Sequence, residues 1–133
     1  MQYDDFVGEV QHRARLASRG AAMRAIQATL ETLGERIPAG EASDLAAELP
    51  AELSTFLEDA EGTESFTVDE FFARVAAKET EDLPDAIHHA RAVIAVIQEA
   101  VSAQEVEQVR GRLTDDYIPL FEAGSEGEMD INV

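Results

Sequence analysis

An internal repeat limits the architectures open to this chain. Residues 29–57 recur, at an offset of 64, as residues 93–121. Few positions are identical, but the apolar residues match along the whole stretch. The matched pairs are Leu30/Ile94, Leu33/Ile97, Ile37/Val101, Ala42/Val106, Leu45/Val109, Leu49/Leu113, Leu53/Tyr117 and Leu57/Phe121. Their spacings of three and four residues place them on one face of successive helices, so the pattern predicts a duplicated helical unit.

Residues that start helices repeat with the same offset. Pro38 aligns with Ser102, and Pro50 aligns with Thr114. Proline is tolerated in the first turn of a helix and Ser or Thr caps one, so each pair predicts a helix start. Ser102 is followed three residues later by Glu105, the spacing of a capping box in which each side chain accepts a hydrogen bond from the other residue's backbone N–H.

The segments in front of these helices align with a shift of one residue, which pairs residues 3–10 with residues 68–75. Thr67 and Glu70 there repeat the capping signal. The predicted fold is all-α, an eight-helix bundle built from two similar four-helix repeats, and Gly20 is expected to end the first helix. The expected helices span residues 3–19, 21–35, 39–49, 50–58, 67–78, 84–101, 103–112 and 114–122.

The length of the chain predicts one domain, over residues 1–122, made of repeats at about residues 3–58 and 67–122. The connection at residues 59–66 is acidic and contains glycine, so a solvated loop is expected there. Residues 123–133 show no periodicity and predict a mobile acidic tail.

Charge and cysteine content exclude several functions. The 133 residues include 28 acids, 10 basic residues and no cysteine, which gives a net charge of −18. This excess repels nucleic acid and anionic membranes, so neither is an expected partner. The absence of cysteine removes thiol catalysis and iron–sulfur ligation. It also fits a reducing compartment, and because no signal peptide or membrane-spanning run is visible, a cytoplasmic protein is predicted.

The acids are spread along the whole chain, and Lys78 is the one lysine. This pattern is typical of proteins from salt-in halophilic archaea, where an acidic surface keeps proteins soluble under heavy screening. An acidic protein from a mesophile is the alternative.

Three stretches resemble a known family. They are Tyr3-Asp4-Asp5-Phe6, residues 30–38 (LETLGERIP) and residues 39–50 (AGEASDLAAELP). Together they resemble domain-of-unknown-function family 2267, over roughly residues 3–122. The resemblance implies a small all-helical protein of bacteria and archaea, and it implies no catalytic or binding residue because the family has no assigned activity. The second copy departs from the first where Ser102 and Thr114 replace the two prolines.

No catalytic, cofactor-binding or metal-ligating residue is predicted, and no cofactor. His88 and His89 follow Asp85 at helical spacing and are the one candidate metal pair. Adjacent histidines point about 100° apart on a helix, however, so at most one pairs well with Asp85. We therefore expect His88, His89 and His12 to be exposed or paired locally, with Asp85 favoured by the positive end of the helix dipole.

A few cations stand out in the acidic second half. They are Arg74, Arg91, Arg110 and Arg112. They could clamp an anion or a partner's carboxylate, but pairing within the chain is the preferred interpretation. The expected partners of the last two are Glu105, Glu107, Asp115 and Asp116.

These observations favour a non-enzymatic helical protein that binds another protein or another copy of itself. The alternative is a small-ligand binder or metal-assisted enzyme with a site between the two repeats, because ligand sites favour such interfaces. A third hypothesis, an acidic surface that mimics nucleic acid for a basic partner, requires clustered charge, and the even spread of the acids argues against it.

Overall fold

The computed structural model describes residues 1–60 and 62–125, and every regular element in this part of the chain is helical. The elements are α1 (Tyr3–Arg13), α2 (Arg19–Arg36), α3 (Ala39–Glu48), α4 (Ala51–Glu58), α5 (Val68–Glu79), α6 (Leu83–Ala100), α7 (Ala103–Arg110), the 3-10 turn η1 (Asp115–Tyr117) and α8 (Ile118–Ser125). The predicted all-α class is confirmed. None of the described helices has the length and apolar character needed to cross a membrane.

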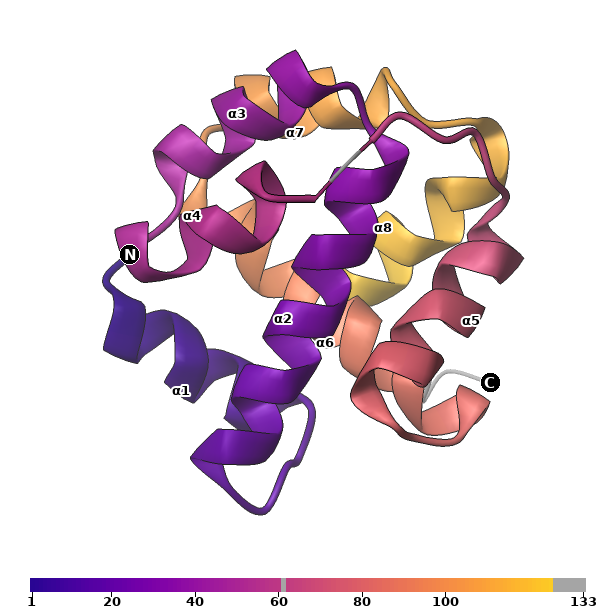
Figure 1. The fold of residues 1–133 in the computed structure, drawn as a ribbon. Helices are drawn as coiled ribbons and strands as arrows, with labels where there is room; N and C mark the ends of the chain where they lie inside the picture. The colour runs from indigo at the N-terminus through magenta and orange to yellow at the C-terminus, as the bar shows by residue number, and fades with distance from the viewer. Residues whose placement is uncertain (61, 126–133) are drawn as a thin grey trace.

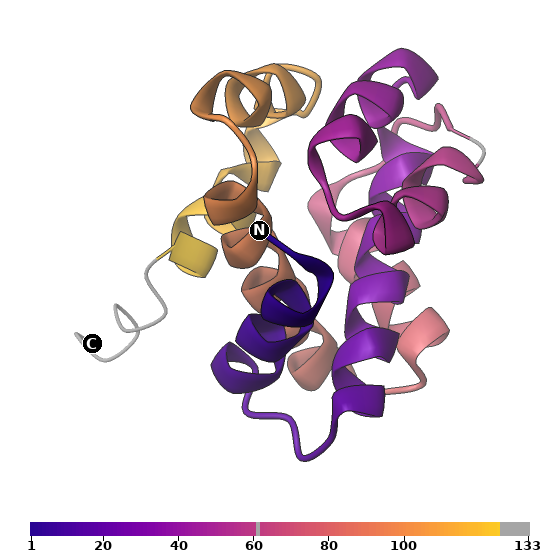
Figure 2. The same cartoon turned by 90° about the vertical axis from the view of Figure 1, so that its left-hand side faces the viewer.

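The two longest helices, α2 and α6, form the centre of the molecule and contact each other. Both α1 and α5 pack against each of these two helices, α4 covers α2, and α8 covers α6. Figure 2 shows the result as two groups of helices side by side, with α3 and α4 on one side and α7 and α8 on the other. At one end of the molecule α3 and α7 contact each other across the gap between these groups.

One continuous hydrophobic core joins the helices. It takes Phe6 and Val10 from α1, Phe71 from α5, and long runs of aliphatic residues from α2 and α6. The Phe71 ring lies edge-on to the Tyr117 ring, with 5.8 Å between the ring centroids. Edge-to-face pairs of this kind add to the gain from burial, so the helices of the described chain share a single packed interior.

The first helix ends earlier than the sequence predicts. Residues 3–19 were expected to be helical, but α1 stops at Arg13, and Arg15 takes a left-handed conformation with φ of 56°. The backbone N–H of Arg15 donates to the His12 carbonyl and that of Leu16 donates to the Gln11 carbonyl. This is a Schellman motif, in which a left-handed residue ends the helix and a hydrophobic residue follows it.

Gly20 does not interrupt a helix, because it lies inside α2. Ser18 is the N-cap of that helix, and its side chain accepts a hydrogen bond from the Ala21 backbone N–H. The glycine expected to end the first helix therefore lies in the second helix, which begins at a polar cap two residues earlier.

The other helix starts agree closely with the prediction. Pro38, Pro50, Thr67 and Ser102 are the N-cap residues of α3, α4, α5 and α7. The last expected helix differs, since residues 115–117 form the 3-10 turn and α8 runs on to Ser125. Of the tail predicted at residues 123–133, the first three residues belong to α8 and residues 126–133 lie outside the described part.

Candidate functional site

The histidines predicted to be exposed or locally paired fall into two groups. His12 near the end of α1 and His88 on α6 are exposed, and Asp85 is exposed in the first turn of α6. In the part of the chain that the structure describes, no group of three or more His, Cys, Asp or Glu side chains could hold a metal ion. His88 and His89 therefore belong to no such group within the described residues.

His89 is buried and has a carboxylate partner that was not predicted from the sequence. Its Nδ1 lies 2.5 Å from Oε2 of Glu79, the last residue of α5, and both side chains are almost fully shielded from water. Burial raises the pKa of the Glu79 carboxyl, and the charge and hydrogen bond of His89 oppose that rise. A signal for this burial was present, because His89 shares a helix stripe with the buried Ala86 and Val93.

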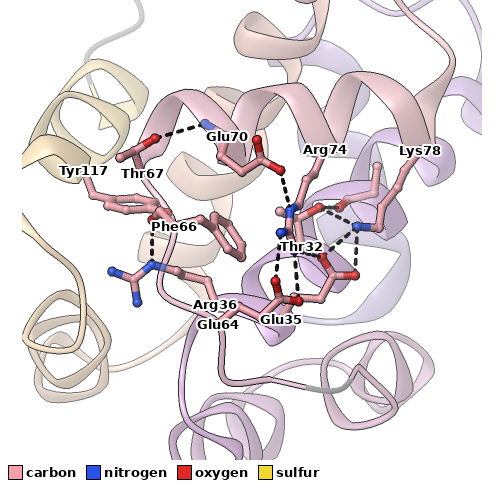
Figure 3. A network of polar contacts seen from close by, with 11 residues as sticks. Thr32, Glu35, Arg36, Glu64, Phe66, Thr67, Glu70, Arg74, Lys78 and Tyr117 are labelled. Carbon is pink, nitrogen blue, oxygen red and sulfur yellow. Dashed lines mark hydrogen bonds and ion pairs between the residues drawn. The ribbon is translucent and has the colours of Figure 1, made fainter.

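The predicted pairing of the arginines within the chain holds for Arg74, which is the centre of a polar network (Figure 3). Its guanidinium contacts Glu35, Glu64 and Glu70 at 3.1, 2.9 and 2.9 Å. Glu35 lies between Arg74 and Lys78, whose Nζ is 3.0 Å from the same carboxylate. The network links the end of α2 and the segment between α4 and α5 to α5. The side chains of Arg74 and Lys78 thus stabilise the fold.

A second part of the same network surrounds the Phe66 carbonyl. This oxygen accepts hydrogen bonds from Tyr117 Oη at 2.8 Å and from Arg36 Nε at 2.9 Å. Burial raises the pKa of Tyr117 to about 12, so its hydroxyl stays a donor at any physiological pH. The Arg74 guanidinium covers the Phe66 ring, 3.9 Å from its centroid. The segment that joins α4 to α5 is thus partly built into the core.

Arg112 also pairs within the chain, but with a different partner from those expected. Its Nε lies 3.3 Å from Oε1 of Glu41 on α3. Near it, the capping box predicted for Ser102 and Glu105 is only half formed. Ser102 Oγ accepts from the Glu105 backbone N–H, but the Ser102 N–H donates to Glu48 of α3. The Glu105 carboxyl faces Glu41 instead, because the contact between α3 and α7 supplies another acceptor for the cap.

The remaining cation of α7, Arg110, borders an open groove of about 300 Å³ between α7 and α8. The groove is lined by Glu107, Arg110, Gly111, Leu113, Thr114, Asp115, Tyr117, Ile118 and Phe121. The Arg110 guanidinium lies over the Phe121 ring, 5.3 Å from its centroid, and no carboxylate or carbonyl accepts a hydrogen bond from it within the described residues. On the rim, Ile118 is 40 % exposed. No sequence signal identifies this groove, because residues 107–121 reach it from separate elements.

Two comparisons with known proteins place the chain. The family model described as "Uncharacterized conserved protein (DUF2267)" matches residues 3–120. A search of curated proteins finds no match. The family match spans α1 to α7 and the first residues of α8.

Proposed function

Since the chain belongs to the DUF2267 family of uncharacterized conserved proteins, whose description names no activity, we propose its function from its surface: a non-enzymatic helical module that binds another protein. The partner occupies the groove between α7 and α8. The observation that carries this proposal is an open groove that combines an exposed isoleucine with an arginine that has no carboxylate partner among the described residues.

The chemistry of the groove describes the partner. Leu113 and Ile118 offer apolar surface for an aliphatic or aromatic side chain. Arg110 offers a guanidinium from which no carboxylate accepts a hydrogen bond within the described residues. The partner is therefore a protein segment in which an apolar residue lies next to a carboxylate. The apolar residue contacts Leu113 and Ile118, and the carboxylate pairs with Arg110.

A site-specific photocrosslinker tests the proposal. Replacing Ile118 by p-benzoylphenylalanine and irradiating cells that express the protein should give a discrete crosslinked product. The same residue at the exposed Ala47 of α3 is the matched control and should give none. Adding Arg110→Glu to the Ile118 probe should abolish the product, because the clamp on the carboxylate is reversed in charge.

Two results would overturn this reading of the groove. One is a crosslinked product that forms equally well from Ala47. The other is a product from residue 118 that survives Arg110→Glu unchanged, since the partner would then ignore the chemistry on which the proposal rests.

We also propose that the eight helices are two four-helix repeats related by a twofold-like operation. The contacts support it: α1 packs on α6 as α5 packs on α2, and α4 covers α2 as α8 covers α6. Ion pairs match as well, since Arg13–Glu99 and Lys78–Glu35 occupy equivalent positions. The left-handed residues Arg15 and Thr80 also lie 65 positions apart, the offset of the front segments.

Burial of the matched apolar pairs supports the same proposal. In six of the eight pairs both residues are buried, and the exceptions, Val106 and Leu113, are partly buried against the core. A chain that ends after Glu58 should then unfold or self-associate, because about 60 residues bury a marginal core. A monomeric half that melts cooperatively would contradict the proposal that each half needs the other.

A cytoplasmic location and a salt-in halophilic origin remain parts of the same proposal, supported by the absence of cysteine and the net charge of −18. The change of Tm with potassium chloride concentration tests the halophilic origin. A ligand-binding or metal-assisted enzyme with a site between the repeats stays a prediction from the sequence.

A further inference from the structure

The contact between α3 and α7 is held by polar interactions at both ends of the two helices. The Ser102 N-cap of α7 donates its backbone N–H to Glu48, the last residue of α3, at 2.8 Å. Arg112, just past the end of α7, pairs with Glu41 in the first turn of α3. The start of each helix thus meets the end of the other, so the two helices run in opposite directions.

Two carboxyl groups are buried in the contact between α3 and α7. Glu41 is 7 % exposed and Glu105 is 4 % exposed, and their side chains lie within hydrogen-bonding reach of each other. The Oε2 atom of each is buried and accepts no hydrogen bond from any donor in the described residues. Arg112 reaches only the other oxygen of Glu41. Each of the two carboxyl groups therefore keeps one buried oxygen without a donor among the described residues.

Such a pair cannot hold two full charges without a large cost, because like charges at this separation repel strongly in a site shielded from water. The other groups facing the pair do little to relieve this. From α3, Asp44 and Glu48 add negative charge, and from the segment after α7, Arg112 supplies the cation. Burial, then the hydrogen bond and charge of Glu41, then Glu48 and Asp44, raise the pKa of Glu105 to about 7.

We propose that Glu41 and Glu105 form a proton-binding site: one proton bridges the two buried carboxyl groups and holds α7 against α3, and its loss leaves two like charges that push the helices apart. Some enzymes use two carboxyl groups that share a proton as a catalytic dyad, but this pair lies between two helices, and neither glutamate lines the groove between α7 and α8. Its role is to make the α3–α7 contact depend on pH.

The direction of that dependence follows from linkage. The folded protein holds the Glu105 proton up to about pH 7, whereas an unfolded chain releases it near the ordinary value of 4.5. Between these values the folded state binds more protons, so the stability that the site contributes is full at acid pH and is lost as the pH rises through about 7. This sign is opposite to that of an ion-paired carboxylate.

The site also bears on the groove, through a step that rests on the proposed function. Glu107, Arg110 and Gly111 lie on or next to α7 and line the groove on its other side. Movement of α7 away from α3 would therefore displace one wall of the groove and make partner binding depend on pH. The proton site itself can be tested without any partner.

The test is an NMR titration of ¹³C-labelled glutamate carboxyls, from about pH 4 to about pH 9. The full-length protein should show one glutamate that titrates near pH 7. Glu105→Gln should remove this signal. Glu41→Gln should lower the pKa of Glu105 by about one unit or more, because an amide donates a hydrogen bond and carries no charge. Glu52→Gln, which removes an exposed acid on α4, is the control and should leave the titration near pH 7 in place.

Amide hydrogen exchange tests the consequence for α7. After correction for chemical exchange, protection of α7 should fall by up to about tenfold between about pH 6 and about pH 8 in the unaltered protein. Glu105→Gln should keep its protection, because its amide replaces the shared proton. The proposal fails if every glutamate titrates in the ordinary range, or if α7 responds to pH equally in both proteins. It also fails if replacing sodium by tetramethylammonium moves the neutral titration by about one unit or more, since the pair would then bind a cation.

Discussion

Gly34 of α2 lies directly against Ala60, just past the end of α4. A Cβ added to Gly34 would stand 2.7 Å from the Ala60 Cβ and 2.7 Å from the Leu57 carbonyl oxygen. One of these neighbours is backbone, which cannot swing away as a flexible side chain would. The two helices approach this closely because position 34 has no side chain.

Gly34→Ala should therefore destabilise the protein by about 1–3 kcal/mol, because one inserted methyl group forces α2 and α4 apart. The measurement is the free energy of unfolding in urea. Gly8→Ala is the matched control: Gly8 lies in α1 with nothing within 4 Å of an added Cβ. That change should stabilise the protein by about 1 kcal/mol through helix propensity. Equal effects at the two positions would show that α2 and α4 are not in close contact.

Thr80 ends α5 in a left-handed conformation, with φ of 60° and ψ of 53°. A β-branched residue is strained there, whereas glycine is not. Thr80→Gly should raise the free energy of unfolding by about 1 kcal/mol. The same substitution at the exposed Thr55, inside α4, should lower it by about 0.5 kcal/mol. If both variants lose stability, the left-handed end of α5 is wrong.

Removing the His89 ring should leave the Glu79 carboxyl buried without its partner. His89→Ala is expected to cost about 1–3 kcal/mol, the range for leaving a buried polar group without its hydrogen-bond partner. His88→Ala, one position away and exposed, should change stability by no more than about 0.5 kcal/mol. Thermal unfolding of both variants at one pH measures the contrast, and a small loss at position 89 would argue against a buried pair.

Salt should stabilise the protein. With 28 acids against 10 basic residues, like-charge repulsion opposes the compact state. The Debye length falls from about 10 Å at 0.1 M to about 3 Å at 1 M, so molar potassium chloride screens most of this repulsion. Tm should rise across that range. A flat or falling Tm would contradict the halophilic interpretation.

Most helix starts could be predicted from the sequence because their signals are local. Pro38, Pro50, Thr67 and Ser102 each act within one turn, and all four are N-caps in the structure. The end of α1 was missed for a related reason. The left-handed residue there is Arg15, and the usual signal for that conformation is a glycine.

The features of the candidate sites could not be read in the same way, because they depend on which helices meet. Glu79 lies ten residues before His89, and only the turn between α5 and α6 brings the two together. Glu105 has the spacing of a capping box, yet the approach of α3 redirects its carboxyl to Glu41. The groove beside Arg110 is a property of shape, which no spacing records.

The ion pair between Arg13 and Glu99 has a consequence for synthesis of the chain. The two residues lie 86 positions apart, and they join α1 to α6 at 2.7 Å. A ribosome adds about 5–20 residues per second, so α1 waits about 4–17 seconds for this partner after it emerges. During that time the part of its apolar surface that faces α6 remains open to water and to chaperones, and the nascent chain completes its core only after most of it has been made.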